Sequence, residues 1–379
     1  MDERSHNTIE GRIIVGLSGG VDSAVAALLL KRKGYDVHGL FMKNWEEDDE
    51  DGYCAAEEDL SAAKAVANKL DIPLDTVNFS SEYWDRVFEY FLSELSEGRT
   101  PNPDILCNRE IKFQAFLDYS LSKGAEKIAT GHYACSKRYP DNIELRRASD
   151  LDKDQTYFLH QVAGTALKKA LFPLCRYQKS DVRQMALDAG LANYDRKDST
   201  GICFIGERRF NDFIARYFPN KPGDILTTDH KKIGEHRGLM FHTIGQRKGL
   251  GIGGRQDSAE EPWFVTEKRM EDNTLIVAQG HDNPALYANG LEAHSLHWIT
   301  RTPGESTFHC TARTRHRQKD VPCHVQLDDA SGCIVTFEQP MRAIAPGQSV
   351  VFYDDQVCLG GGVIQRAFQL PGAVRIKTG

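Results

Sequence analysis

Hydrophobic and polar residues alternate along the first half of the chain in blocks that predict strands and helices in turn. Short runs rich in branched apolar residues predict buried parallel strands at residues 12–17, 37–42, 74–79 and 127–130. Between these runs, apolar residues recur at helical spacing over residues 21–30, 60–70, 84–95 and 111–121. This alternation predicts an α/β fold with a doubly wound parallel sheet, whose ligand lies beyond the carboxyl ends of the strands.

The pattern changes after about residue 210, where glycine and short β-rich runs replace the long helices. Such runs occupy residues 263–266 and 274–278, and a series of them extends from residue 308 to residue 351. Several short strands separated by turn signals predict a barrel or a sandwich. We therefore expect three domains: an α/β domain that carries the site, a small linking domain and a C-terminal β-barrel, over residues 1–213, 214–280 and 281–379.

The junction between the first predicted strand and helix carries the sequence Gly-Leu-Ser-Gly-Gly-Val-Asp-Ser, residues 16–23, here called the phosphate loop. The first N–H groups of a helix have no partner within the helix and lie at the positive end of its dipole. Small residues at this point let phosphate oxygens approach the backbone, and the Ser23 hydroxyl can add a donor. The loop lacks the lysine of a Walker P-loop and the spacing of a dinucleotide-binding loop, which excludes both classes.

Two further segments place cysteines where a thiol could do chemistry. In residues 100–108, two prolines predict an extended backbone that delivers Asp104 and Cys107 together ahead of a helix. A helix N-terminus favours a thiolate, so Cys107 could act as one, while Asp104 transfers a proton or binds a base edge. Cys203 lies in a short apolar segment between two glycines, which would let a thiol move between partners. A buried structural cysteine is the alternative in both segments.

Composition sets limits on the class of protein. The chain has 379 residues, of which 40% are hydrophobic and 27% are charged, as in a globular protein of two or three domains. No stretch approaches the roughly 20 apolar residues that cross a bilayer, and the polar start has no apolar signal core, so we expect a cytoplasmic protein without a membrane partner. Nine cysteines without Cys-x-x-Cys pairs argue against a zinc ribbon and a dense disulfide scaffold.

The distribution of charge is compatible with a nucleic-acid partner. The net charge is −7, but acidic residues are concentrated in residues 46–51, while three arginines, a lysine and His316 share residues 313–319. Phosphate binding depends on such local patches more than on the total charge. An ordinary solvated surface is the simpler explanation of each patch when it is taken alone.

Taken together, these motifs resemble those of the bacterial tRNA-specific 2-thiouridylases, a family of PP-loop ATP pyrophosphatases. The sequence of residues 18–23 matches the Ser-Gly-Gly-x-Asp-Ser signature of the PP-loop. Other matching segments extend over nearly the whole chain, at residues 41–45, 102–107, 131–133, 153–159, 201–206 and 346–348. Each segment is short, and their combination carries the resemblance.

The resemblance implies a role for each matching residue. ATP would be held by Gly16, Leu17, Ser18, Gly19, Gly20, Val21, Asp22, Ser23, Met42 and Gly131. The target uridine would face Asn102, Pro103 and Asp104. Contacts with tRNA would come from His132, Lys153, Asp154, Gln155, Arg315, His316 and Gln348. Cys203 would carry a persulfide, and Cys107 would be the nucleophile that helps to release its sulfur.

The reaction that the resemblance implies makes 2-thiouridine at the wobble position of tRNA. ATP would adenylate the C2 oxygen of uridine, pyrophosphate would leave, and sulfur would then displace AMP. Mg²⁺ would accompany ATP, with no permanently bound metal. The partners would be the anticodon stem-loop of tRNA and a sulfur donor, either a persulfide-carrying relay protein or a cysteine desulfurase. Direct attack by the persulfide and attack by released sulfide both stay open, and a Cys107–Cys203 disulfide would remain to be reduced.

Two other functions also stay open from the sequence. A PP-loop ligase that adenylates a small carboxylate or carbonyl would use the same loop but would not need two thiols. Serine at Cys107 or Cys203 would then leave product formation intact. An RNA-binding module with a vestigial nucleotide loop would need neither the loop nor the thiols, although the intact Asp22 and Ser23 weigh against it.

Overall fold

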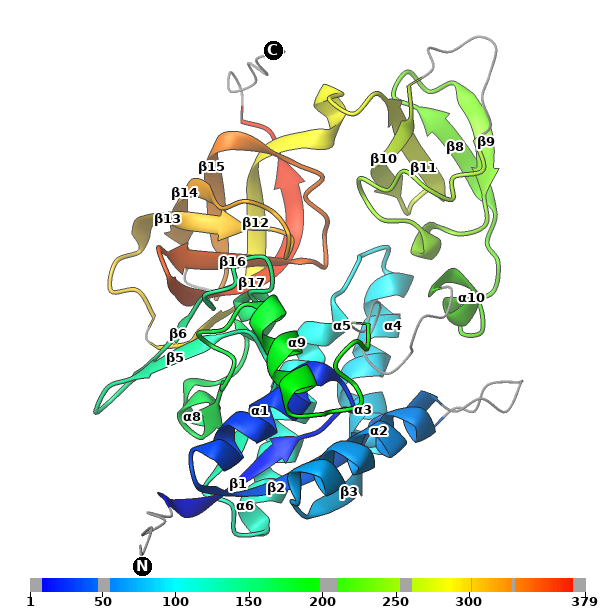
Figure 1. Cartoon of the computed structure of the whole chain (residues 1–379). Coiled ribbons are helices and arrows are strands. Elements are labelled where there is room, and N and C mark those ends of the chain that lie inside the picture. Colours follow the sequence, from blue (N-terminus) through cyan, green and yellow to red (C-terminus); the bar gives the residue numbers. More distant parts are fainter. Residues whose placement is uncertain are drawn as a thin grey trace, which may run out of the picture.

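The computed structural model describes residues 9–46, 55–197, 210–252, 261–300, 302–328 and 331–370 of the chain. Three bodies follow one another along the sequence: an α/β domain, a small β-domain and a C-terminal barrel. Figure 1 shows the α/β domain at the bottom, the small β-domain at the upper right and the barrel at the upper left. The predicted fold class, a doubly wound parallel sheet followed by a small domain and a β-barrel, is confirmed.

The α/β domain is built on a five-stranded parallel sheet in the order β3-β2-β1-β4-β7. Its strands are β1 (Ile9–Gly16), β2 (Tyr35–Lys43), β3 (Leu74–Asn78), β4 (Lys127–Ala129) and β7 (Ala170–Leu171). Ile13 and Val15 in β1 belong to one hydrophobic core, and Ile14 between them belongs to the other. Successive side chains of a strand point to opposite faces, so the apolar run of β1 buries both faces of the sheet.

Helices cover both faces of this sheet. The core of Ile13 and Val15 is shared by α1 (Val21–Arg32), α2 (Ala55–Leu70) and α9 (Lys179–Asp188). Two long helical segments cover the other face. The first consists of α3 (Ser80–Tyr83), η1 (Trp84–Phe88) and α4 (Glu89–Ser96), and the second of α5 (Pro103–Leu106), η2 (Cys107–Ala115) and α6 (Phe116–Ser122). Both segments contain a π-helical stretch, η1 and η2, a local irregularity that occurs frequently at functional sites.

The small β-domain has a four-stranded sheet in the order β10-β11-β8-β9 and a core of its own. Its strands are β8 (Gly223–Thr227), β9 (Lys232–His236), β10 (Trp263–Arg269) and β11 (Thr274–Gln279). Further short helices in the described residues are α7 (Thr156–Leu159), α8 (Gly164–Lys168), α10 (Phe210–Ile214), η3 (Leu239–Phe241) and η4 (Pro284–Leu286).

The C-terminal barrel is closed by pairing between its first and last strands, β12 and β17. Its strands are β12 (Tyr287–Trp298), β13 (Thr307–Arg313), β14 (Val321–Leu327), β15 (Cys333–Arg342), β16 (Ser349–Asp354) and β17 (Val357–Phe368). A hairpin of the α/β domain, β5 (Cys135–Arg138) and β6 (Ile143–Arg146), extends this sheet beyond β17. The sequence did not predict this hairpin, which fastens the barrel to the domain that carries the phosphate loop.

Arg147 makes a second contact between the α/β domain and the barrel. Arg147 is almost fully buried, and its Nη2 lies 3.0 and 2.9 Å from the two carboxylate oxygens of Asp320 in the barrel. Its guanidinium carbon lies 3.7 Å from the centre of the Tyr353 ring, which adds a cation–π contact. The barrel and the α/β domain are therefore joined both by strand pairing and by this buried arginine.

Four of the seven cysteines in the described residues are buried free thiols, and two others form a disulfide that was not predicted. Cys107, Cys323, Cys333 and Cys358 are buried free thiols. The disulfide joins Cys135 to Cys175, which are 40 residues apart in the sequence. Cys203 lies outside the described residues, so the expected Cys107–Cys203 pairing has no counterpart in the part of the chain that is described.

Acid should destabilise the fold through two buried histidines. Burial lowers the pKa of His160 and that of His242 from 6.5 to about 4, so both rings are neutral in the folded protein. A folded-state pKa below the unfolded value means that stability present above pH ~6.5 is lost progressively toward pH ~4, by about 3 kcal/mol for each ring. Urea unfolding across this pH range should show a shallower loss for His242→Phe than for the original chain, and parallel pH profiles would contradict the assignment.

Candidate active site

The phosphate loop has the geometry of an anion-binding turn between β1 and α1. Gly20 is the N-cap of α1 and offers no side chain to cap the helix, so its first-turn amides lie open to a ligand. Within the loop, the Ser23 hydroxyl lies 3.0 Å from the Gly20 carbonyl oxygen and accepts from the Ser18 N–H at 3.3 Å. Gly19 has a φ of +77°, and a Cβ there would lie 2.5 Å from the backbone oxygen of Asp59. Only glycine fits this position.

The parallel sheet brings the other predicted nucleotide residues to this loop. A Cβ on Gly131 would lie 2.6 Å from the Ser23 nitrogen, so the chain after β4 packs directly on the start of α1. A Cβ on Gly16 would lie 3.2 Å from Cε of Met42, at the end of β2. Residues from three strands thus meet at one place, as the common carboxyl edge of a parallel sheet requires. Their contact with ATP stays a prediction.

Asp22 of the phosphate loop is held by two residues that the sequence analysis missed. The Tyr133 hydroxyl donates to Asp22 Oδ1 at 2.9 Å, and Lys179 Nζ lies 2.8 Å from both carboxylate oxygens. Lys179 is the first residue of α9, 157 residues after Asp22, so no local spacing could reveal the pair. Its side chain is 11% exposed. The loop has no lysine of its own, and α9 supplies one from elsewhere in the fold.

A second pair of missed residues contacts the loop from the segment after α9. Asn193 Nδ2 and Arg196 Nη1 donate to the Gly19 carbonyl oxygen at 2.9 and 3.2 Å. Arg196 also pairs with Asp59 of α2 at 2.5 Å, although burial still raises the pKa of that carboxyl. A cavity of about 310 Å³ lies beside these residues, between α2 and the segment that contains Asn193 and Arg196. The loop is therefore enclosed by polar side chains of several elements.

The structure corrects the predicted surroundings of Cys107. Residues 103–106 are helical rather than extended, since Asn102 caps α5 by accepting from the Asp104 N–H at 3.1 Å and Pro103 occupies the first turn. Cys107 therefore follows a complete helical turn and opens η2, where its side chain is fully buried. The expected gain from a helix N-terminus is lost. Asp104 is partly exposed on the same helix.

Five of the predicted RNA contacts gather on one side of the site. Asp154 is buried and accepts from the Ala148 N–H at 3.1 Å and the Thr156 hydroxyl at 2.7 Å, and burial raises its pKa. Lys153 and Gln155 flank it and are partly exposed. His316 Nε2 lies 2.7 Å from the Asp154 carbonyl oxygen.

His132 belongs to the same group and is also buried. Its Nδ1 lies 2.8 Å from the Thr130 hydroxyl, and burial lowers the pKa of the ring well below its usual value. Gln155 accepts from the neighbouring Tyr133 N–H at 2.9 Å, which connects this group to the residue that holds Asp22. The side chains of Asp154 and His132 are thus engaged within the protein, and their contact with RNA stays a prediction.

The remaining two predicted RNA contacts, Arg315 and Gln348, lie where all three domains meet. Arg315 Nη2 donates to the carbonyl oxygens of Ile244 and Ala343 at 2.7 and 3.0 Å. Gln348 Nε2 donates to the carbonyl oxygen of Thr100 at 2.6 Å. Next to this junction lies a cavity of about 150 Å³, lined by residues that include Tyr90, Asn102, Arg109, Gln161, Ser295 and Gly347.

Two classes of feature are absent from the described residues. Within the described ranges, no three His, Cys, Asp or Glu side chains are grouped so that they could hold a metal ion. In the same part of the chain, no helix is long and apolar enough to cross a membrane. Cys203, the predicted persulfide carrier, lies outside these ranges.

Comparison with protein families assigns a model to each of the three bodies. The model described as a tRNA methyl transferase HUP domain matches residues 11–207. A tRNA methyl transferase PRC-barrel domain matches residues 211–279, and an aminomethyltransferase β-barrel domain matches residues 288–364. The fold and the phosphate loop therefore define a HUP-class protein with two appended β-domains.

Two curated relatives identify the family within this class. The tRNA-specific 2-thiouridylase MnmA of Escherichia coli O1:K1 / APEC is 55% identical over 361 residues, which cover 95% of this chain and 98% of the relative. The MnmA of Proteus mirabilis (strain HI4320) is 55% identical over 359 residues, with 94% and 98% covered. The chain belongs to the family of tRNA-specific 2-thiouridylases.

Solved structures are more distant. A 4-thiouridine synthetase in complex with RNA and bound ATP aligns with a TM-score of 0.35 and 16% identity, over 52% of this chain and 46% of that one.

Proposed function

We propose that this chain is a tRNA 2-thiouridylase that replaces the C2 oxygen of the wobble uridine with sulfur and produces 2-thiouridine, AMP and pyrophosphate. The observation that carries the proposal is the 55% identity to a tRNA-specific 2-thiouridylase over 95% of this chain. The geometry supports it, since Gly131 and Met42 pack around the phosphate loop as a nucleotide site requires. A thiol, Cys107, directly follows α5, the short helix that Asn102 caps and that contains Asp104.

The proposed mechanism begins with activation of a poor leaving group. The C2 oxygen of uracil cannot depart as oxide, so ATP first converts it to an adenylate. The open amides at the start of α1 would stabilise the departing pyrophosphate, and Lys179 would offset the charge of Asp22 beside it. Mg²⁺ would arrive with ATP and neutralise its phosphates. Asp22 is the carboxylate of the loop that could face the ion.

Sulfur transfer would use the two predicted thiols and the Asn102–Asp104 turn. Asn102, Pro103 and Asp104 would face a uridine that has left the anticodon stack, as enzymes that act on single bases require. Cys203 would carry the persulfide. In one route, the Cys107 thiolate attacks Cys203 Sγ and displaces hydrosulfide, which then attacks C2 and displaces AMP. In the other, the outer persulfide sulfur attacks C2 and displaces AMP, and Cys107 then attacks Cys203 Sγ and releases the 2-thiouridine. Both routes leave a Cys107–Cys203 disulfide to be reduced. Since Cys107 is fully buried, this attack would require a local opening that exposes its thiol.

The RNA partner would be the anticodon stem-loop, bound in the cytoplasm across the α/β domain and the barrel. Lys153 and Gln155 are exposed enough to contact it, and the buried Asp154 would act by holding the turn between them. His132, Arg315, His316 and Gln348 would complete the contact surface that the resemblance implies. A relay protein or a cysteine desulfurase would load Cys203 with sulfur.

Mass spectrometry of nucleosides tests the proposed activity. Unmodified tRNA incubated with the chain, Mg-ATP and a persulfide donor should gain 2-thiouridine and release AMP, and omission of ATP should abolish the product. The family models carry the words methyl transferase, so S-adenosylmethionine is added in a parallel arm. A methylated nucleoside formed without ATP cleavage, or AMP release without a thiolated nucleoside, would contradict thiolation.

A further inference from the structure

Thr100, two residues before Asn102, is held by hydrogen bonds from outside its own domain. The N–H, the carbonyl oxygen and the hydroxyl of Thr100 each have a partner in another domain. Its N–H donates to the Pro346 carbonyl oxygen at 2.8 Å, and its own carbonyl oxygen accepts from Gln348 Nε2 at 2.6 Å. Its hydroxyl lies 3.4 Å from the Thr243 hydroxyl of the small β-domain. The α/β domain thus relies on the other two domains to place this residue.

The sequence explains why the other domains bind the chain at Thr100. Pro101 and Pro103 have no N–H, so the backbone between them can donate only through Asn102. A residue that precedes proline is also restricted to extended conformations, which keeps the turn from closing on itself. Thr100 is the last residue before this segment bounded by two prolines, and both its N–H and its carbonyl are held by partners. The position of Thr100 therefore helps to set the positions of Asn102 and Asp104.

The barrel residues that contact Thr100 pack closely against it. Gly347 has a φ of +88°, and a Cβ there would lie 2.7 Å from the Thr100 nitrogen, so the two backbones are in direct contact. Gln348 is itself fixed, because its carbonyl oxygen accepts from the Ile364 N–H at 2.8 Å and its N–H donates to Ala345 at 3.2 Å. The amide that holds Thr100 therefore comes from the turn that leads into β16 of the closed barrel, and the backbone of that turn is itself hydrogen-bonded.

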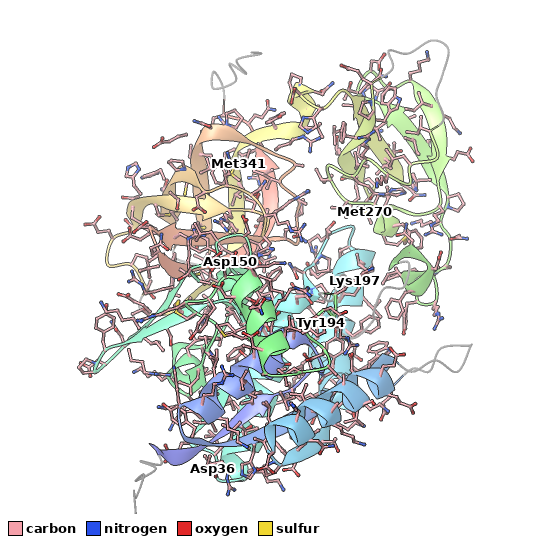
Figure 2. All side chains as sticks on the ribbon, viewed as in Figure 1. Asp36, Asp150, Tyr194, Lys197, Met270 and Met341 are labelled. Carbon is pink, nitrogen blue, oxygen red and sulfur yellow. A yellow bond between two sulfur atoms is a disulfide. The ribbon has the colours of Figure 1, made fainter. Side chains whose placement is uncertain are left out.

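The small β-domain is tied to the same place. Arg315 of the barrel donates to the Ile244 carbonyl oxygen, the residue after Thr243, at 2.7 Å. Gly245 packs so closely on Ala343 that a Cβ on Gly245 would lie 2.5 Å from the Ala343 Cβ. Met270, labelled in Figure 2 at the lower end of this domain, packs against Gly98. The three domains therefore converge on residues 98–100.

We propose that Gln348 is a positioning residue, which holds the Thr100 carbonyl and thereby sets the place of Asn102 and Asp104 for the reaction. In this proposal the barrel positions Asn102 and Asp104 through Thr100, in addition to any contact that it makes with RNA. The contribution of Gln348 appears in the chemical step and persists when tRNA saturates the enzyme. The proposal rests on the proposed thiolation for its rate test, and on the fold alone for its structural test.

Two variants and a matched control test this proposal. Gln348→Leu removes the amide, and Gln348→Glu keeps the size of the side chain but removes the donor toward Thr100. Gln326→Leu makes the same change on an exposed glutamine of β14 in the same barrel. For each, the single-turnover thiolation rate is measured at saturating tRNA, tRNA affinity by filter binding, and amide exchange of residues 96–108 by mass spectrometry.

Both Gln348 variants should slow the saturated rate by roughly tenfold to a hundredfold, the effect of a reacting group displaced by about 1 Å. Exchange across residues 96–108 should rise, and the Gln326→Leu control should leave the rate, the exchange and the tRNA affinity unchanged. Any tRNA affinity that is lost through the predicted RNA contact of Gln348 does not lower a rate measured at saturating tRNA. A normal saturated rate with weakened tRNA affinity would make Gln348 an RNA contact and overturn the proposal, as would unchanged exchange. If the original chain does not thiolate at all, the proposed function fails, while the exchange measurement still decides the role of Gln348.

Discussion

Replacing Cys107 by Ser should abolish 2-thiouridine formation and leave ATP binding intact. The hydroxyl of serine is a far weaker nucleophile than a thiolate and cannot form a disulfide, so we expect a loss of at least about a thousandfold. Cys107 opens η2, whereas the phosphate loop is built from β1 and α1. The substitution therefore leaves the nucleotide site untouched. Single-turnover thiolation with a persulfide donor and equilibrium binding of labelled ATP measure the two quantities separately.

A buried cysteine elsewhere provides the control for this substitution. Cys358 in β17 is also a free thiol that is almost fully buried, and no chemical role is predicted for it. Cys358→Ser should cost comparable stability and retain thiolation. Cys203→Ser should behave as Cys107→Ser does, since either thiol alone cannot complete the transfer. Product formation at the original rate by Cys107→Ser would favour the PP-loop ligase, which needs neither thiol.

The sequence predicted the elements and the phosphate loop because both depend on neighbouring residues. The run of branched residues in β1 and the Ala- and Leu-rich α1 are local patterns, and the loop between them is contiguous. Residues 102–106 show where local patterns were misjudged. Two prolines indicated an extended chain, whereas Asn102 and Pro103 are an N-cap and a first-turn residue, signals that also lay in the sequence.

The rest of the site could not be predicted, because it is made by contacts between distant residues. Lys179 reaches Asp22 across 157 residues, and Gln348 reaches Thr100 across 248. The hairpin of β5 and β6 was not predicted for another reason. Its strands are only four residues long, and Lys137 and Arg138 are exposed at its end. Neither period nor composition marks such a strand, whose place is set by pairing with the barrel.

Replacing Lys179 by Met should weaken ATP binding and slow AMP formation by about a hundredfold. Lys179 Nζ is 2.8 Å from both Asp22 oxygens, and neither side chain is more than 31% exposed. Without Lys179, the negative charge of Asp22 would no longer be offset by a cation, although the Tyr133 hydroxyl would still donate to it. The Asp22 carboxylate would then repel the negatively charged phosphates of ATP that bind beside it. Equilibrium binding of labelled ATP and the rate of AMP release measure the effect.

The double variant Asp22→Asn with Lys179→Met separates charge balance from catalysis. If Lys179 acts mainly by offsetting Asp22, removing both charges should restore much of the ATP affinity lost in Lys179→Met, while AMP formation stays low because Asp22 is part of the reactive loop. Lys232→Met is the control, since it removes a lysine that pairs with Asp224 at 2.6 Å on the exposed surface of the small β-domain. Additive losses in the double variant would show that Lys179 acts on the nucleotide independently of Asp22.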